Sequence, residues 1–353
     1  MKAVRNYGPG DFRLEDIPIP QIDEDEILAK TEACGICAGD VKTYQGAPYL
    51  WDIEPPWIKT PVIPGHEFYG KIVEIGKKAH DRYGLKVGDY AVPEHIVPCG
   101  KCRFCKTGHY TACNVHHIFG YQGGIDDGGF AEYIKYPKQA IVHRVPDNFS
   151  QEQGVMIEPL ACAIHAVQRG KIELRDTLVI AGMGPLGLCM LQVAKLKNPS
   201  LLIALDVETN RLNLAKSLGA NVVINPQQED AVKIVKDLTD NYGCDVYIEV
   251  TGHPSGVTQG LEMIRRQGRF VEFSVHSEKT CVDWSEIGDR KEIDIYGAHL
   301  GPYSYPLAIK YVEEGKVKVK SIVTHKFLLD EFQKALIFAA QKKENAIKVA
   351  LVP

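Results

Sequence analysis

The sequence lacks long hydrophobic runs. No stretch of its 353 residues approaches the roughly 20 apolar residues that a membrane-spanning helix needs. It also lacks a basic excess, because 41 lysine and arginine residues stand against 45 aspartate and glutamate residues, for a net charge of −4. The two signs are mixed along the chain, which argues against a nucleic-acid or membrane surface. The expected partners are small molecules and further copies of the same chain.

An export signal is also missing at the N-terminus, where Met1 to Gly8 contain no apolar core and no cleavage site. Ten cysteines would suit disulfides in a secreted protein, but four of them lie within fifteen residues at metal-ligand spacing. We therefore expect reduced thiols and a cytoplasmic protein. The length, with 45% hydrophobic and 24% charged residues, suits a globular chain of two domains.

The cysteine cluster has the spacing C-x2-C-x2-C-x7-C and consists of Cys99, Cys102, Cys105 and Cys113. Four thiolates satisfy tetrahedral zinc completely and leave no open position, which predicts a structural site. An iron–sulfur cluster is the competing interpretation. Zinc is preferred because a redox centre has no evident task here. A nucleic-acid-binding ribbon is disfavoured because the flanks offer few basic residues, namely Lys101, Arg103, Lys106 and His109.

A second candidate metal site combines Cys37 with His66 and Glu67 of the stretch Pro64-Gly65-His66-Glu67, and with Glu158. A thiolate, an imidazole and one or two carboxylates are the ligand types of a catalytic zinc, in which one position stays open for water or substrate. Glu158 belongs to an apolar stretch, residues 151–170, that looks helical. A carboxylate buried there must be paired, protonated or bound to metal; the alternative is a surface glutamate before a proline.

Two neighbouring features have plainer interpretations. Cys34 and Cys37 show C-x-x-C spacing, but no βαβ pattern surrounds them, and Cys34 is expected to be a buried core residue. Residues 45–64 form a loop rich in proline and aromatic residues. That loop is either a rigid connection or, since it lies between two proposed ligands, a wall of the substrate pocket.

A dinucleotide-binding motif begins the second domain. The apolar run 176–181 enters Gly182-Met183-Gly184-Pro185-Leu186-Gly187, and an apolar helix over 188–195 follows. Glycines in the pattern G-x-G-x-x-G let a pyrophosphate approach the N-terminus of the helix. A second strand, 201–205, ends at Asp206, where a carboxylate can accept hydrogen bonds from ribose hydroxyls and repel a 2′-phosphate. NAD is therefore preferred over NADP, and Arg211 either covers the adenine or begins a helix.

Further strands continue a doubly wound parallel sheet at 221–224, 244–250, 268–274 and 293–297, with helical stretches between them. In the first domain, residues 1–30, 70–76, 87–92 and 128–134 predict short barrel-type strands. The tail from about residue 300 predicts a helix over 305–314, a strand, and a helix near 329–343. It is expected to fold back onto the first domain.

Taken together, these motifs resemble those of the zinc-dependent medium-chain dehydrogenase/reductase superfamily, over nearly the whole chain. The likeness is greatest to its sorbitol (polyol) and threonine dehydrogenases. The resemblance implies an α/β protein in which a GroES-like β-barrel catalytic domain, residues 1–162 and 300–353 with a zinc lobe at about 95–115, accompanies a Rossmann NAD-binding domain, residues 163–299. It also implies two zinc ions per chain and a dimer or homotetramer.

The resemblance further implies the roles of individual residues. Cys37, His66 and Glu67 are zinc ligands, and Glu158 either ligates the metal or holds its water. The NAD-binding set consists of Gly182, Gly184, Pro185, Leu186, Gly187, Asp206, Arg211, Phe273, Ser274, Val275, Ala298, His299 and Leu300.

Two departures from the family pattern concern the substrate. Gly39 stands where the family has a serine or threonine that relays the alcohol proton, so the relay passes through water, Lys42, Thr43 or Tyr44. The arginine and tyrosine that grip sorbitol are replaced within 297–303. We therefore expect NAD-dependent oxidation of a sorbitol-like or shorter polyol, such as erythritol or threitol, to a ketose. The alternatives are a threonine 3-dehydrogenase, a general alcohol dehydrogenase, and a zinc- and nucleotide-binding regulator without turnover.

Overall fold

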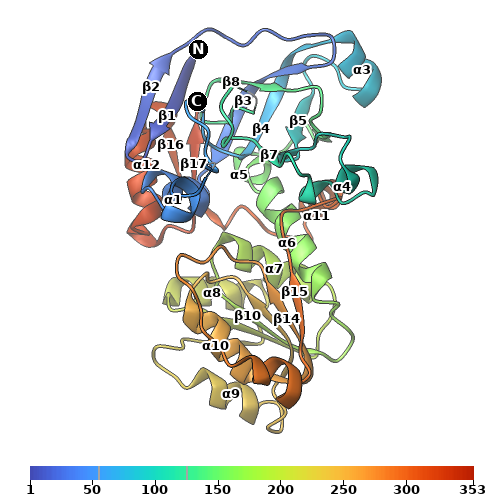
Figure 1. Cartoon of the computed structure of the whole chain (residues 1–353), viewed down its shortest axis with the longest axis vertical. Helices are drawn as coiled ribbons and strands as arrows, with labels where there is room; N and C mark the ends of the chain where they lie inside the picture. Colours follow the sequence, from blue (N-terminus) through green and yellow to red (C-terminus); the bar gives the residue numbers. More distant parts are fainter. Residues whose placement is uncertain (55, 125) are drawn as a thin grey trace. The chain divides into compact units, whose positions relative to one another are not determined.

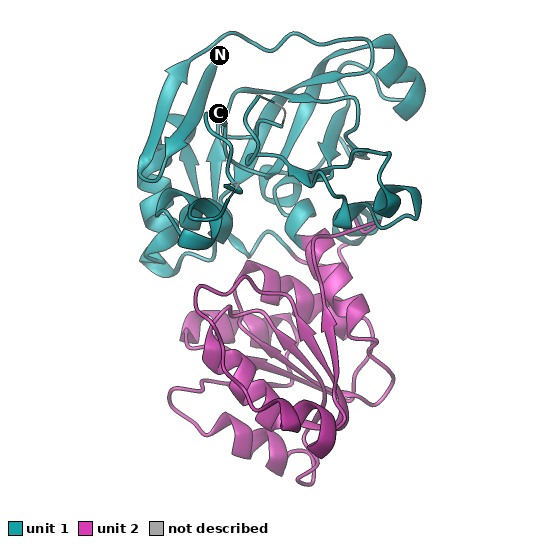
Figure 2. Cartoon of the chain, in the orientation of Figure 1, with its two compact units in different colours: residues 1–159, 305–314, 319–353 teal, residues 160–304, 315–318 magenta. Residues whose placement is uncertain are grey.

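The computed structural model describes residues 1–54, 56–124 and 126–353 (Figure 1). Pro55, which belongs to the proline-rich loop predicted above, lies outside the described residues. The chain divides into two compact units (Figure 2). Unit 1 contains residues 1–159, 305–314 and 319–353, and unit 2 contains residues 160–304 and 315–318. The sequence analysis places the boundary between the domains after residue 162, whereas the structure places it between Pro159 and Leu160.

Unit 1 is built on a seven-stranded, largely antiparallel sheet in the order β16-β17-β3-β4-β5-β9, with β8 also paired to β3. Its strands are β3 (Ile27–Gly35), β4 (Glu67–Ile75), β5 (Tyr90–Pro93), β8 (Tyr133–Tyr136), β9 (Val142–Val145), β16 (Val323–Leu328) and β17 (Lys348–Val352). Two hairpin-like pairs accompany it, β1 (Lys2–Gly8) with β2 (Asp11–Asp16), and β6 (Ile96–Val97) with β7 (His117–Ile118). One buried apolar cluster joins residues of this sheet to helix α12 (Phe332–Ala340).

Short helices connect the strands of unit 1. They are α1 (Ala38–Tyr44), α2 (Pro48–Trp51), α3 (Lys77–Tyr83), α4 (Arg103–Lys106), α5 (Gln151–Gly154), α11 (Tyr305–Glu313) and α12 (Phe332–Ala340), with single turns η1 (Tyr110–Ala112), η3 (Leu329–Glu331) and η4 (Lys343–Asn345). Helix α6 (Ile157–Arg169) carries the chain from the first unit into the second. Of the C-terminal tail from about residue 300, residues 305–314 and 319–353 belong to unit 1, whereas residues 300–304 and 315–318 belong to unit 2.

Unit 2 contains a six-stranded parallel sheet in the order β12-β11-β10-β13-β14-β15. The strands are β10 (Thr177–Ala181), β11 (Leu201–Leu205), β12 (Val222–Ile224), β13 (Cys244–Glu249), β14 (Ile264–Glu272) and β15 (Asp294–Gly297). The helices are α7 (Pro185–Lys195), α8 (Thr209–Leu218), α9 (Ala231–Asp237), α10 (Pro254–Met263) and the π-helical η2 (Glu286–Arg290). Every residue of β10 is buried, as expected for a parallel strand covered by helices on both faces. The predicted doubly wound sheet is confirmed.

Residues 151–170 are mostly helical, as predicted, but they form two helices, because α5 ends at Gly154 and α6 begins only at Ile157. Gly154 packs so tightly that a β-carbon there would lie 2.1 Å from the Tyr69 ring. Glycine is a poor helix former, and this packing position excludes a better one. The strand β17, which follows the last predicted helix, was not anticipated from the sequence.

None of the helices in the described ranges combines the length and the hydropathy that a membrane crossing requires.

Candidate metal and cofactor sites

Strand register brings the first group of predicted site residues together. In the antiparallel pair β3–β4, Gly35 lies opposite Glu67, so Cys37, just past the end of β3, comes close to His66 and Glu67 at the start of β4. On the other side of β3, Ala350 of β17 lies opposite Gly35, which brings Lys348 to the same end of the strand. The close approach requires a glycine at position 35, where a β-carbon would lie 2.2 Å from a Glu67 carboxylate oxygen.

The donor atoms of Cys37, His66 and Glu67 all lie within 4.8 Å of one another, and His66 and Glu67 are buried. His66 Nδ1 is buried and has no hydrogen-bond partner among the described residues. The nearest carboxylate is Asp40, whose Oδ1 lies 3.8 Å from His66 Nδ1. The other oxygen of Asp40 accepts a 2.8 Å hydrogen bond from the backbone N–H of Cys37. One carboxylate thus positions the N-terminus of α1 and lies beside the imidazole.

Lys348 is a site residue that sequence reasoning missed. Its side chain is buried, and Nζ donates to Glu67 Oε1 at 2.6 Å, to Glu67 Oε2 at 2.5 Å and to the Ile36 carbonyl at 3.1 Å. Burial by itself lowers the pKa of Lys348. The charge of Glu67, its hydrogen bonds with Lys348 and the charges of Cys37 and Glu158 together outweigh burial and hold the pKa above its usual range. The ammonium group therefore offsets one negative charge in the cluster.

Glu158 is also buried, but its direct partner is His95. Glu158 Oε1 lies 2.9 Å from His95 Nδ1, and the Tyr305 hydroxyl lies 3.0 Å from the same nitrogen. The rings of His95 and His66 are 5.9 Å apart between centroids. Glu158 therefore lies near the first cluster within a carboxylate–histidine–tyrosine group, and His95 and Tyr305 are neighbours that the sequence did not indicate.

The donor set of the first cluster fits a zinc ion. Thiolate, imidazole and carboxylate are its usual ligand types, and three protein ligands leave a position open. Burial raises the pKa of Cys37 well above its ordinary value, so its thiolate requires a nearby cation such as the metal. The unpartnered nitrogen of His66 is consistent with a ring held for coordination.

The three residues considered for proton relay take different positions. Lys42 lies on α1 with Nζ 5.8 Å from the centre of the Tyr49 ring, and burial lowers its pKa. The Thr43 hydroxyl donates to the Gly39 carbonyl at 2.8 Å. The Tyr44 ring packs edge-on against Phe12 at 5.0 Å. Thr43 and Tyr44 are thus engaged within their own surroundings.

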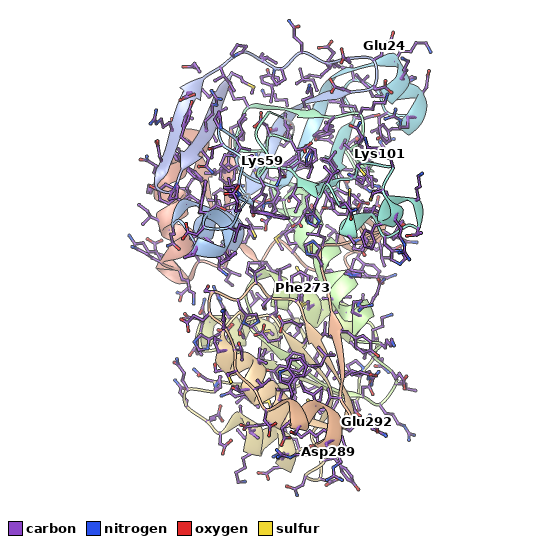
Figure 3. The ribbon with its side chains drawn as sticks, in the orientation of Figure 1. Glu24, Lys59, Lys101, Phe273, Asp289 and Glu292 are labelled. Atoms are coloured by element: carbon purple, nitrogen blue, oxygen red, sulfur yellow. The ribbon has the colours of Figure 1, made fainter. Side chains whose placement is uncertain are left out.

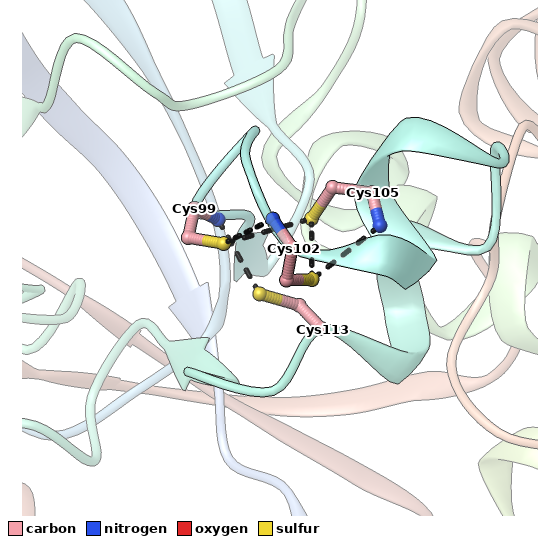
Figure 4. A group of neighbouring side chains, drawn as sticks. All are labelled: Cys99, Cys102, Cys105 and Cys113. Atoms are coloured by element: carbon pink, nitrogen blue, oxygen red, sulfur yellow. Dashed lines mark hydrogen bonds between the residues drawn. The ribbon is translucent and has the colours of Figure 1, made fainter.

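The four-cysteine lobe, residues 99–113, is the second metal candidate (Figure 4). The Sγ atoms of Cys102 and Cys105 lie 3.5 Å apart, and those of Cys99 and Cys105 lie 4.0 Å apart. Zinc–sulfur bonds of about 2.3 Å place the corners of a tetrahedron about 3.8 Å apart, between these two values. A multi-iron cluster would require wider spacing, because its core must fit between the sulfur atoms. The lobe therefore fits one zinc ion.

Backbone N–H groups also point at the sulfur atoms of the lobe. Those of Cys102 and Cys105 donate to the sulfurs of Cys99 and Cys102 at 3.4 and 3.5 Å. Backbone donors such as that of Cys105 lower the pKa of Cys102 to about 6. Such bonds favour the thiolate form that a metal requires. Lys101, labelled in Figure 3, is an exposed residue between two of the cysteines, so the lobe lies at the surface.

The glycine-rich turn of unit 2 lies between β10 and α7, as predicted. A β-carbon on Gly187 would lie 1.8 Å from the Gly182 carbonyl oxygen, so only glycine allows this approach of helix to strand. At Gly184, the residue before Pro185 and Leu186, a β-carbon would meet only Arg211, at 3.8 Å. The space at the N-terminus of α7 is thus open apart from a guanidinium group, which suits a pyrophosphate.

Asp206 follows the end of β11 and is buried. Its two oxygens accept hydrogen bonds from the backbone N–H groups of Met183, at 2.6 Å, and Glu208, at 2.8 Å. A carboxylate oxygen has more than one lone pair, so a ribose hydroxyl can still donate to it. The carboxylate is therefore fixed directly beside the glycine-rich turn.

The remaining predicted cofactor residues follow the ends of two adjacent strands. Phe273 (labelled in Figure 3), Ser274 and Val275 follow β14, and Ala298, His299 and Leu300 follow β15. Glu249, Glu272 and Gly297 lie level across β13, β14 and β15, so all six residues lie at the carboxyl edge of the sheet. This edge is where open α/β sheets bind ligands.

Family models match both parts of the chain. The model described as the alcohol dehydrogenase GroES-like domain matches residues 23–147, and the zinc-binding dehydrogenase model matches residues 185–314. The chain therefore belongs to the zinc-dependent medium-chain alcohol dehydrogenases, and it is an oxidoreductase with a GroES-like and a Rossmann domain.

Individual relatives show which dehydrogenases of this family the chain is similar to. The chain is 48% identical to the erythritol/L-threitol dehydrogenase of Mycolicibacterium smegmatis, covering 100% of this chain and 98% of the relative. It is 34% identical to the sorbitol dehydrogenase of Bacillus subtilis (100% and 97% covered). It is 35% identical to the L-threonine 3-dehydrogenase of Pyrococcus furiosus (95% and 93% covered). Among solved structures, 2R,3R-butanediol dehydrogenase from Bacillus subtilis matches with a TM-score of 0.88 at 29% identity, covering 100% and 99% of the two chains.

Proposed function

We propose that the chain oxidises a secondary hydroxyl group of a short polyol, such as erythritol or threitol, to a ketose with NAD as hydride acceptor. The observation that carries the proposal is the mixed donor cluster of Cys37, His66 and Glu67 in a chain 48% identical to an erythritol/L-threitol dehydrogenase. Three of the relatives named above act on a polyol or a diol, which agrees with this substrate class.

The residues of unit 1 have distinct roles in this proposal. Cys37, His66 and Glu67 would hold the zinc ion, which when bound supplies Lewis acidity toward the reacting hydroxyl group. Asp40 Oδ1 lies 3.8 Å from His66 Nδ1, beyond hydrogen-bond distance, so Asp40 adds negative charge beside the ring without fixing its orientation. Lys348 offsets the charge of Glu67 and so keeps a negatively charged ligand set tolerable in a buried site. Glu158 either ligates the metal or holds its water.

The residues of unit 2 support NAD rather than NADP in this proposal. NAD supplies the hydride acceptor. Asp206, held by two backbone N–H groups, would accept hydrogen bonds from the adenosine ribose and repel a 2′-phosphate. Val207 and Glu208, the next two residues, offer no cation for such a phosphate. Arg211, beside the opening at Gly184, is proposed to contact the pyrophosphate.

The experiment is to measure zinc per chain and NADH production against a panel of three- to six-carbon polyols, with threonine and ethanol included. Two zinc ions and the highest kcat/KM for a four-carbon polyol are expected. Activity on threonine alone would move the protein to the threonine dehydrogenases, one of which is 35% identical. One zinc ion and no turnover on any alcohol would favour the alternative of a zinc- and nucleotide-binding regulator without enzymatic activity. Replacing NAD with NADP in the same assay tests the cofactor preference. Asp206→Gly is expected to reduce the ratio between kcat/KM measured with NAD and kcat/KM measured with NADP.

We further propose a cytoplasmic homo-oligomer, a dimer or a tetramer. None of the ten cysteines, all of which lie in the described ranges, forms a disulfide, which agrees with a reducing compartment. Strand β15 ends the parallel sheet of unit 2, and Ile295 on it is 45% exposed, so this edge is a candidate contact between copies. Light scattering of the purified protein measures the oligomer.

A further inference from the structure

Tyr121 has no role in the mechanism described so far, yet its hydroxyl group lies among the metal-site residues. A β-carbon on Gly39 would lie 2.6 Å from the Tyr121 hydroxyl oxygen, 3.7 Å from Cys37 Sγ and 4.0 Å from His66 Cε1. The rings of Tyr121 and His66 are 5.6 Å apart between centroids. The phenol group therefore takes the space that any side chain at position 39 would need, beside two proposed zinc ligands.

The position of Tyr121 is well fixed by its surroundings. Its carbonyl oxygen accepts a 2.9 Å hydrogen bond from the Lys59 N–H, and its own N–H donates to the Ile118 carbonyl at 3.2 Å. Its ring packs against a small apolar cluster of Leu50, Ile58 and Val62. A side chain anchored in this way loses little further freedom when its hydroxyl group makes a new hydrogen bond.

Two other hydroxyl groups around the cluster, those of Thr43 and Tyr305, are already engaged. Thr43 donates to the Gly39 carbonyl, and the Tyr305 hydroxyl bonds His95. Within the described ranges, by contrast, the Tyr121 hydroxyl makes no hydrogen bond, and the residue is only partly buried. The phenol oxygen is therefore available to a molecule that enters the site.

We propose that Tyr121 is a catalytic residue whose hydroxyl oxygen accepts the proton of the reacting alcohol. The step balances: the O–H bond of the alcohol breaks, an O–H bond forms on Tyr121, and the proton that Tyr121 carried passes to water. NAD, when bound, would supply the hydride acceptor, so the net products would be a ketone, NADH and one proton. This inference rests on the proposed alcohol oxidation, and it assigns the relay to a residue 82 positions beyond Gly39 in the chain.

The experiment moves the hydroxyl group from one residue to the other. Tyr121→Phe removes only the oxygen atom and is expected to lower kcat/KM for the polyol by about 100-fold, the scale of general acid–base catalysis. Gly39→Ser alone is expected to lower activity, because its β-carbon collides with the Tyr121 oxygen. In the double variant Gly39→Ser with Tyr121→Phe, the serine hydroxyl group has room. The kcat/KM of the double variant should be at least about tenfold higher than that of Tyr121→Phe alone.

A readout independent of turnover is the dissociation constant of erythritol for the zinc-loaded enzyme with NADH, measured by calorimetry. Tyr121→Phe should weaken it by about 5- to 10-fold, the value of one hydrogen bond, with zinc content and melting temperature unchanged. Tyr83→Phe is the matched control, because it removes a tyrosine hydroxyl that bonds the Ala140 carbonyl elsewhere in unit 1; its kcat/KM should stay at the wild-type value.

A Tyr121→Phe variant with wild-type rate and affinity would overturn the assignment, and so would a loss of rate that serine at position 39 does not recover. Both results are distinguishable from failure of the proposed function, in which the wild-type enzyme itself would neither bind nor oxidise any polyol.

Discussion

The two metal-ligand clusters of unit 1 differ in almost every property except the metal they fit. The four-cysteine lobe draws its ligands from fifteen consecutive residues, lies at the surface, and offers sulfur alone. The Cys37–His66–Glu67 cluster mixes three donor types and depends on Asp40 and Lys348 for support. Four cysteines would surround a zinc ion completely, whereas the three ligands of the second cluster would leave one position open.

The difference lies in how the negative charge is stabilised. In the lobe, backbone N–H groups donate to the sulfur atoms, and such donors come with the local turn itself. In the buried cluster, a full ammonium group from a distant strand is required, because desolvation of Glu67 has no local compensation. The buried cluster should therefore be the more sensitive of the two to single substitutions.

The largest expected effect separates the two clusters by function. His66→Ala should lower kcat by at least about 1,000-fold, because the metal loses a ligand and the substrate its Lewis acid, while one zinc ion per chain remains in the cysteine lobe. Metal analysis alongside steady-state kinetics measures both quantities. His109→Ala, an exposed histidine of the lobe region, is the control and should keep two zinc ions and full activity. Loss of both ions from His66→Ala would contradict the independence of the clusters.

A second variant tests the ammonium group of the buried cluster. Lys348→Met should destabilise the protein by about 3–5 kcal/mol, since it leaves Glu67 as a buried charge without its partner. Urea denaturation gives the free energy of unfolding. Adding Glu67→Gln to Lys348→Met should recover part of the loss, because the unpaired charge is then gone. If the double variant were less stable than the single one, the ion pair would not be the cause.

A third variant addresses the surface lobe. Cys113→Ser should reduce the zinc content to one ion per chain and speed proteolytic cleavage within residues 99–113 by about tenfold, because local opening becomes easier without the metal. Mass spectrometry of timed digests locates the cuts. Cys281→Ser removes an exposed thiol outside both clusters and should change neither quantity. Cleavage spread evenly over unit 1 would show that the lobe is not a separate stability unit.

The smallest effect comes from an ion pair outside both clusters. Lys326 Nζ lies 2.6 Å from Glu152 Oε1, and its hydrogen bond lowers the pKa of Glu152 to about 2. The pKa of Glu152 in the folded state lies below its unfolded value of about 4.3. The ion pair therefore stabilises the folded state above about pH 4.3, and this stabilisation is lost as the pH falls toward about 2. With solvent screening, Lys326→Met should cost about 1 kcal/mol at pH 7. Urea denaturation at pH 7 and pH 3 should show this cost shrinking with acid; a constant cost would contradict it.

The sequence predicted those parts of the fold whose cause is local. The apolar run 201–205 is strand β11 with the same bounds, because a fully buried parallel strand needs an uninterrupted apolar segment. The turn at 182–187 was predictable for a similar reason at one position, since a β-carbon on Gly187 would collide with the carbonyl of Gly182, five residues earlier. Cys34, expected to be a core residue, is fully buried.

The supporting residues of the buried cluster were not predictable in this way. Lysine is rarely buried, so nothing near Lys348 marks it as a partner of a glutamate on another strand. Tyr121 and His95 likewise lie in stretches whose patterns predict only loops and short strands. These contacts depend on the register of β17, β3 and β4, which single-sequence patterns do not determine.

The pairing of β17 with β3 also limits the order in which parts of the chain can fold. Glu67 and Lys348 are 281 residues apart in sequence, and unit 2 lies within the intervening segment. The entropy of closing so long a loop must be overcome before their contact contributes, so contacts of this kind form late in folding. Early folding of unit 2 shortens the effective loop. The metal cluster is thus completed last, and a chain that has not yet docked its final strand cannot hold an ion there as tightly as the finished enzyme.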